Sequence, residues 1–341
     1  YLFCASEYNP DESQFIAGAM ALARDPVFWR SVDGVTSGPL DFYALLPLHW
    51  LGLPLDYFGA RFTALILTWL ALWFVYRVVR AETPAAVARW GIIPGAAFFA
   101  AASAPDFIHY SSELTPIALL ALAVYLGGRA PLAAVFVAGC LPWAKLQAAP
   151  LAVVIVGWEL WQVWKTRREP RSPWRRAGAL VASAAAPTFA VLALVVAFGQ
   201  WEHFFRRFIL QNIAYVARGY PANVVAADML RFARESGHFL PWLWAMVIFL
   251  GLGGAACLWW RVRLPARSWF AVFLFAAAVA CIATPARASL HYLFFLLVPA
   301  MLGTGLLLAG LWSLPRARWP VAALVLACAL APLVARTRQP Q

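Results

Sequence analysis

Charged residues are scarce in this sequence. Asp, Glu, Lys and Arg together make up 12% of the 341 residues, whereas a typical soluble domain has about 25%. Hydrophobic residues make up 63%, and the mean hydropathy is +0.72. This composition excludes an ordinary soluble globular protein, and it predicts a protein that is embedded in a membrane.

Cysteine is also rare, and its spacing excludes a zinc or disulfide framework. The five cysteines are far apart, and four of them lie in apolar runs. No pair has the short spacing of a metal-ligand motif, so we expect thiols that only contribute to packing. They are Cys4, Cys140, Cys257, Cys281 and Cys328.

Long apolar runs fill most of the sequence. Residues 178–199 and 240–260 are each about 20 residues long, which is the length of a helix that crosses a bilayer core. Because backbone polar groups in lipid must be satisfied within the protein, repeated runs of this kind predict a helical bundle. The opening YLFCA is apolar and lacks Met, so we expect one more span upstream. We predict an all-α polytopic transmembrane bundle of about ten spans, at 59–79, 91–105, 116–126, 131–143, 146–164, 178–199, 240–260, 269–283, 292–312 and 320–335.

The basic residues predict how these spans are oriented. If the segment before residue 59 is outside and the spans alternate, the inner side holds 15 of the 27 Lys and Arg residues and three of the 15 acids. This asymmetry follows the positive-inside rule. The formal charge of +12 is therefore a topology signal and not a nucleic-acid-binding surface. The basic segment KTRREPRSPWRR at 165–176 is then an inner loop that faces anionic lipid headgroups.

The other 12 acids fall on the outer side, and seven of them precede residue 59. The outer loops are expected at about 6–58, 106–115 and 200–238. A transporter more often places its polar groups near the bilayer midplane, and we find no internal repeat. The distribution favours an active site that faces outward.

The stretch YNPDESQF at 8–15 opens a predicted interfacial helix. Asn9 suits the N-cap, Pro10 the first helical position, and Glu12 the reciprocal position of a capping box. Capping and the helix dipole are the structural alternative for both acids, and they explain Glu12 better than Asp11. A second interfacial helix is expected in PLDFYALLPLHW at 39–50.

The second outer loop contains three ionisable residues between two apolar spans, namely Asp106, His109 and Glu113. Ionisable groups this close to a bilayer are costly, so they are functional candidates. Capping by Ser111 or Ser112 is the structural alternative, and His109 by itself is expected to be a polar interfacial residue.

Cations on the outer side are candidates for holding a phosphate. Arginine binds phosphate with two parallel hydrogen bonds, and lysine binds it as a point charge. Snorkelling or pairing with nearby acids is the alternative for each. The candidates are Lys145, Arg218, Arg287 and His291.

Several of these segments resemble one family of membrane enzymes. They are the acid pair in PDESQFIAGAMAL, the segment SGPLDFYALLPLHWLG, the acid in YSSELTPIALLALAVYLG, and HYLFFLLVPAML. Their order resembles that of integral-membrane glycosyltransferases of the GT-C class, in the branch related to protein O-mannosyltransferases and the aminoarabinose-lipid A transferase. The resemblance covers most of the chain and is strongest from residue 8 to about 150.

The resemblance implies a single transmembrane glycosyltransferase domain over 1–341. Such an enzyme takes a sugar from a polyprenyl-phosphate carrier and passes it to a lipid, glycan or protein acceptor. Asp11 matches the catalytic acid of the first loop and is the expected general base, Glu12 matches its neighbour, and Glu113 or Asp106 matches the second-loop acid. Some members bind a divalent metal and others need none, so the resemblance leaves open a Mg, Mn or Ca ion at Asp11 and Glu113. The expected location is a bacterial inner membrane, with the site facing the periplasm.

The chemistry expected of these residues is a direct displacement. A carboxylate removes the proton of the acceptor hydroxyl, cations stabilise the phosphate that leaves, and the anomeric centre inverts. Two other classes remain open: a lipid-linked saccharide flippase or transporter, and an O-antigen-ligase-like enzyme that uses a diphosphate donor. A scaffold protein would tolerate loss of the outer acids.

Overall fold

The computed structural model describes residues 9–34, 36–102, 104–165 and 172–337. The opening YLFCA with Cys4, most of the basic stretch at 166–171 and the end of the chain at 338–341 lie outside the described residues, so the expectations for them stay predictions. Cα packing divides the chain into two compact units. The first holds Tyr1–Ala71, His109–Pro221 and Ala280–Arg287, and the second holds Leu72–Ile108, Ala222–Val279 and Ala288–Gln341.

Every predicted span coincides with a helix among the described residues. These helices are α4 (Tyr57–Arg80), α5 (Ala85–Ala101), α7 (Leu114–Leu126), α8 (Pro131–Ala144), α9 (Ala149–Lys165), α10 (Pro173–Ala197), α14 (Phe239–Trp259), α15 (Arg267–Ala283), α16 (Leu297–Trp312) and α17 (Arg318–Thr337). Within the described part of the chain, five segments are long and apolar enough to cross a membrane, at Tyr57–Arg80, Leu146–Lys165, Pro173–Ala197, Phe239–Trp259 and Leu290–Trp312. Large apolar side chains are exposed on them, such as Phe189 at 70% and Leu258 at 82%. The helices therefore indicate a membrane-embedded protein, and the number of spans stays a prediction.

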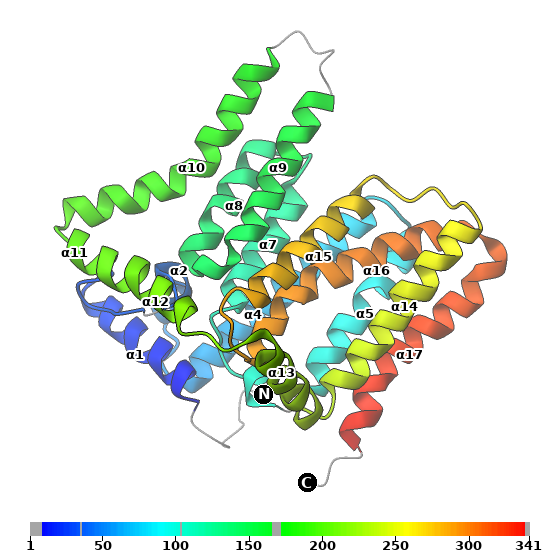
Figure 1. The fold of residues 1–341 in the computed structure, drawn as a ribbon, viewed down its shortest axis with the longest axis horizontal. Helices are drawn as coiled ribbons and strands as arrows, with labels where there is room; N and C mark the ends of the chain where they lie inside the picture. Colours follow the sequence, from blue (N-terminus) through cyan, green and yellow to red (C-terminus); the bar gives the residue numbers. More distant parts are fainter. Residues whose placement is uncertain (1–8, 35, 103, 166–171, 338–341) are drawn as a thin grey trace. The chain divides into compact units, whose positions relative to one another are not determined.

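In the first unit, α7, α8, α9 and α10 pack side by side (Figure 1). The approach of α8 to α10 is close because Gly139 has no side chain: a Cβ there would lie 3.0 Å from the carbonyl carbon of Ala184. Helix α10 is mostly exposed within the protein, as expected of a helix whose apolar surface faces lipid. The core of this helix group includes Val135, Val163 and Leu180.

The second unit is built around α16, which is the most buried of the long apolar segments. Helices α5, α14 and α17 pack around it (Figure 1). Small residues allow α5 to approach α16, since a Cβ on Gly91 would lie 2.8 Å from the Cα of Gly305. Small residues at a helix contact are typical of packing in membranes.

The predicted outer loops are largely helical. The first contains α1 (Pro10–Arg24), α2 (Pro39–Tyr43) and α3 (Leu46–Trp50), so the second predicted interfacial helix is divided in two before Pro47. The region predicted as a third loop contains α11 (Trp201–Phe204), a π-helical turn at Phe205–Leu210, α12 (Gln211–Ala217) and α13 (Ala222–Glu235). Helix α6 (Pro105–Ile108) lies in the second.

In the first unit, segments that were assigned to the same side of the membrane contact one another. The Arg207 guanidinium lies 3.0 Å from the Asp33 carboxylate, the Gly38 N–H donates to the Ala144 carbonyl at 2.7 Å, and the Tyr220 N–H donates to the Ala286 carbonyl at 2.8 Å. All six residues belong to segments predicted to be outer. In the second unit, Glu82 and Arg267, both predicted to be inner, are 2.9 Å apart. These contacts agree with the predicted alternation of the helices.

Candidate functional site

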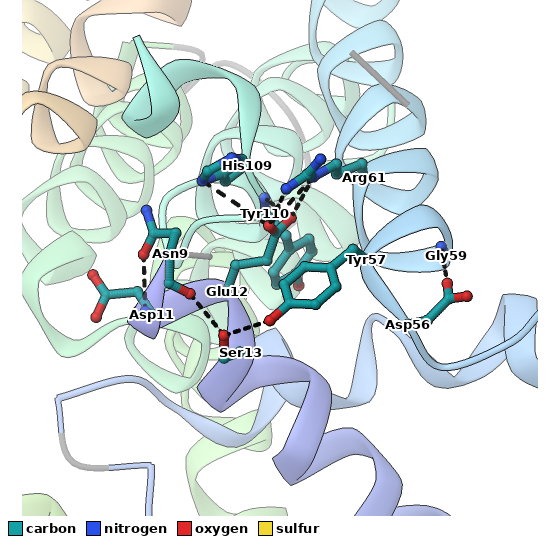
Figure 2. Close-up of polar contacts among 10 residues, drawn as sticks. All are labelled: Asn9, Asp11, Glu12, Ser13, Asp56, Tyr57, Gly59, Arg61, His109 and Tyr110. Carbon is teal, nitrogen blue, oxygen red and sulfur yellow. Dashed lines mark hydrogen bonds and ion pairs between the residues drawn. The ribbon is translucent and has the colours of Figure 1, made fainter. Parts of the chain in front are cut away.

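The first component of the site is a buried ion pair between Glu12 on α1 and Arg61 on α4. Arg61 Nη2 lies 2.9 Å from Glu12 Oε2, and Arg61 Nε also donates to the carboxylate. The backbone N–H of Tyr110 donates to Glu12 Oε1 at 3.0 Å (Figure 2). Glu12 is 0% exposed and Arg61 is 5% exposed. This pair therefore joins three segments of the first unit that are distant in the sequence.

The capping box expected at the start of α1 is only partly present: the Asn9 cap forms, but the reciprocal bond from Glu12 does not. Asn9 is the N-cap, as predicted, and its Oδ1 accepts the Asp11 N–H at 2.9 Å. Glu12 does not serve the cap, because its carboxylate is occupied by Arg61 and Tyr110. Asp11 is exposed, and its carboxylate points away from that of Glu12 (Figure 2). Of the two adjacent acids, Glu12 is buried in an ion pair and Asp11 is accessible.

His109 is buried, which differs from the expected interfacial position. It is 2% exposed, and its Nδ1 lies 4.0 Å from Glu12 Oε2. The acid on α1 gives the imidazole a polar neighbour inside the protein, and this contact accounts for the burial. His109 thus belongs to the surroundings of Glu12.

The second component is a buried ion pair between Glu113 and Lys145. The Lys145 ammonium donates to Glu113 Oε1 and, at 2.5 Å, to Ser112 Oγ. Glu113 is 0% exposed and Lys145 is 4% exposed. Neither Ser111 nor Ser112 caps α7: the N-cap residue is Glu113, without a side-chain capping bond. The structure therefore brings together a predicted second-loop acid and a predicted phosphate-binding cation.

The third component is Asp41 on α2, whose side chain is completely buried. Neither of its carboxyl oxygens has a hydrogen-bond partner among the described residues. Burial raises the pKa of the Asp41 carboxyl well above its usual value, and the Glu113 charge adds to this effect while the Lys145 charge and the Thr115 hydroxyl oppose it. The direction of this shift favours the neutral carboxylic acid at Asp41.

Backbone contacts hold Asp41 in this place. Residues 37 and 145 form an antiparallel bridge, and the neighbouring Gly38 N–H bonds to the Ala144 carbonyl at 2.7 Å. Gly38 is required there, because a Cβ would collide with the Trp143 carbonyl. The Tyr110 hydroxyl also donates to the Asp41 carbonyl at 2.5 Å. The segment SGPLD is thus fixed against the chain on which Lys145 lies.

The pH dependence of stability follows from the neutral state of Asp41. A carboxyl whose pKa is raised by folding stabilises the fold below its unfolded pKa of about 4, and this contribution is lost as the pH rises through the raised pKa. We expect Asp41→Asn to remove this loss, so that the variant is relatively more stable than the wild type at alkaline pH. Thermal unfolding in detergent at a series of pH values measures the effect. Parallel pH curves for the two proteins would contradict it.

A fourth component is the arginine at the end of the 280–287 segment. Arg287 stacks on Tyr215, with its guanidinium carbon 4.5 Å from the ring centroid, and it also faces Tyr220 at 5.6 Å. Its Nη2 donates to the Arg218 carbonyl at 3.4 Å, and its Nε has no acceptor among the described residues. The preceding Ala286 has a φ of +50°, a strained conformation for a residue with a Cβ. Arg218 is exposed next to this stack.

Two predicted site residues lie in the second unit. His291 Nδ1 is 3.9 Å from Asp106 Oδ2, and the His291 ring also contacts the Ser289 hydroxyl at 2.9 Å. Asp106 and His291 therefore pair with each other, whereas Asp11, Glu12, Glu113, Lys145, Arg218 and Arg287 belong to the first unit.

The residues left open for a divalent metal do not fit one. The Lys145 ammonium occupies the coordinating side of Glu113, so a cation there would have to displace it. Asp11 is exposed, and the described residues contain no group of three or more His, Cys, Asp or Glu side chains that could hold a metal ion.

Sequence reasoning missed Arg61 and Asp41. Arg61 lies within a predicted span and is one of the few cations there, which is a usable signal because an ionisable group in a span needs a partner. Asp41 lies inside the SGPLDFYALLPLHWLG segment, where its neighbours predicted an interfacial helix. Its burial depends on tertiary contacts with Tyr110 and Lys145 that no local pattern shows.

Comparisons of the chain with protein-family models, with curated proteins and with solved structures found no match.

Proposed function

We propose that the protein is a glycosyltransferase that moves a sugar from a polyprenyl-phosphate carrier to an acceptor at the outer face of the membrane. The observation that supports this most is the gathering of acids and cations in the first unit, where apolar helices end. Glu12, Asp41, Glu113, Arg61 and Lys145 are all at least 95% buried there. Buried charges at this density are costly, and a catalytic site is a common reason to retain them.

The accessible groups of the first unit supply the roles that the reaction needs. Asp11 is the general base, because it is exposed and Figure 2 shows no cation bound to its carboxylate. Arg287 binds the phosphate, since its planar group is held by Tyr215 and an N–H is unused. Arg218 adds a second exposed cation. The Glu12–Arg61 pair fixes the helix that carries Asp11.

The proposed reaction forms one carbon–oxygen bond, breaks another and transfers one proton. The acceptor oxygen attacks the anomeric carbon, its proton passes to Asp11, and the carbon–oxygen bond to the polyprenyl phosphate breaks. The leaving phosphate gains negative charge, which the arginines stabilise. No covalent enzyme intermediate is needed, and the anomeric centre inverts.

Asp11→Asn is expected to lower sugar transfer by about 100- to 10,000-fold, the usual effect of losing a general base. The assay uses the purified protein in liposomes with a panel of hexosyl and pentosyl polyprenyl phosphates. Asn9→Ala is the matched control: it removes the cap acceptor of the Asp11 N–H, costs about 1 kcal/mol of stability, and keeps transfer. Full transfer by Asp11→Asn would show that Asp11 is not the base.

The same assay separates the rival classes. A flippase would move the lipid-linked sugar across the bilayer of wild-type liposomes without transferring it. A ligase-like enzyme would transfer only from a polyprenyl diphosphate. Either outcome would contradict the proposed function.

A further inference from the structure

The Glu113–Lys145 pair raises a problem for the proposed reaction. Lys145 is the predicted phosphate-binding lysine, yet its ammonium donates to Glu113 and Ser112. An incoming phosphate would have to draw Lys145 away, and Glu113, which is 0% exposed, would lose the cation that compensates it. Breaking a buried pair in this way is strongly unfavourable unless another group replaces the cation.

Asp41 has the properties of that replacement. Its carboxyl group is buried, interacts electrostatically with both Glu113 and Lys145, and has no hydrogen-bond partner among the described residues. A buried polar group that is left unsatisfied costs about 1–3 kcal/mol, so its retention calls for an explanation. A carboxylic acid can donate its O–H to a carboxylate, and such a charge-assisted bond is short and strong.

We propose that Asp41 is a positioning residue that allows Lys145 to bind an anionic phosphate. When Lys145 turns from Glu113 to the phosphate, the Asp41 O–H donates a hydrogen bond to Glu113 in place of the ammonium. Only hydrogen bonds change, and no proton leaves the protein. The identity of the anion as a phosphomonoester rests on the proposed function, whereas the exchange itself rests on the Glu113–Lys145 ion pair, on the burial of Asp41 and on the backbone bridge that holds the Asp41 segment against residue 145.

The chain geometry suits this exchange. Glu113 is the N-cap of α7, and Lys145 has an extended conformation at the end of α8, where the helix stops before the next turn begins at Leu146. Both charged groups therefore lie at helix ends. Asp41 is held by the 37–145 bridge and by Tyr110, so it stays beside Glu113 while the Lys145 side chain moves.

Two substitutions of Asp41 test whether its hydrogen-bond donor or its shape is needed for phosphate binding. Asn keeps a group that donates a hydrogen bond to Glu113, and Leu has the same branching at Cγ, with a larger volume and without a donor. Binding of undecaprenyl phosphate to the full chain in detergent is measured by titration, with undecaprenol as the uncharged control and inorganic phosphate as a second anion. We expect Asp41→Asn to bind the lipid phosphate as the wild type does and Asp41→Leu to bind it about 10- to 100-fold more weakly.

The stability of the empty protein is the second readout. Asp41→Leu removes an unsatisfied buried group, and this gain offsets the strain of the larger side chain, so the proposal expects a folded variant about as stable as the wild type without ligand. A purely structural role predicts the opposite, and a Leu variant that fails to fold would overturn the proposal. Equal binding by the Leu variant and the wild type, or equal losses for Asn and Leu, would also overturn it.

The two anions separate this inference from the proposed function. If undecaprenyl phosphate does not bind the wild type while inorganic phosphate binds and shows the Asn–Leu difference, the lipid donor is wrong and the exchange is supported. If the lipid phosphate binds all three proteins equally, the exchange is wrong and the proposed function is untouched. Binding of neither anion to the wild type would contradict both.

Discussion

Replacement of Arg61 by Met is expected to destabilise the protein by about 3–5 kcal/mol. The loss leaves the Glu12 carboxylate, which is 0% exposed, without its cation. The Tyr110 N–H would then be the main remaining donor to it, and one neutral donor does not compensate a buried charge. Thermal and denaturant unfolding in detergent measure the effect, which is a large fraction of the roughly 5–15 kcal/mol that stabilises an ordinary protein.

The chain provides both a rescue and a control for this prediction. In Glu12→Gln with Arg61→Met, neither charge is buried, so most of the lost stability is expected to return. Arg206 forms the same type of pair with Glu202 at 3.0 Å, but both side chains are 71% exposed. Arg206→Met is therefore expected to change stability by less than about 1 kcal/mol. Equal effects of the two arginine substitutions would contradict the role given to the buried pair.

The helices were predictable because lipid imposes a strong and local constraint. An apolar run must satisfy its own backbone, so its length and composition alone predict a helix. Even the short runs at 116–126 and 131–143 are helices, and Pro142 does not end α8, which continues to Ala144. The region at 200–238 was expected to be a loop, because its charges interrupt the apolar pattern, yet it contains α12 and the amphipathic helix α13.

The distribution of Lys and Arg predicted on which side of the membrane each segment lies, but it did not predict which side chains form contacts. Sorting Lys and Arg by side grouped Asp33 with Arg207 and Glu82 with Arg267, which are in contact. Such a sorting has no information on distance within a side. It could not show that Glu113 forms an ion pair with Lys145 or that Asp106 pairs with His291. Nor could it show that Glu12, and not Asp11, is buried.

The two acids at the start of α1 show why tertiary contacts decide such questions. Local chemistry favoured Glu12 for the cap, since it is three residues after Asn9. Asn9 instead binds the Asp11 N–H by itself, and the turn of the helix directs Glu12 toward α4. Arg61 is 49 positions away in the sequence. Arg61 lies inside a predicted span, where most side chains face lipid. Its charge nevertheless requires a partner within the protein.

Removal of Lys145 is expected to give the second large effect, because it affects both folding and transfer. Lys145→Met leaves the buried Glu113 without its cation, a loss of up to about 3–5 kcal/mol, of which a hydrogen bond from Asp41 would offset a part. Adding Glu113→Gln removes that charge, so the double variant is expected to recover most of its stability. Transfer is not expected to recover, since a cation that stabilises the leaving phosphate is worth about 100- to 1,000-fold in rate. Unfolding and transfer, measured on the same preparations, give both values.

This pattern separates a functional ion pair from a structural one. If the Glu113–Lys145 pair served only the fold, the stable double variant would transfer sugar at nearly the wild-type rate. That result would remove Lys145 from the reaction and leave phosphate binding to Arg287 and Arg218. Lys145→Arg provides a further check: it keeps the charge but replaces a compact ammonium with a planar fork. The Lys145 ammonium also donates to Ser112, and Lys145 is only 4% exposed, so the larger guanidinium is expected to disturb the pair. We expect this variant to fold but to transfer sugar more slowly than the wild type.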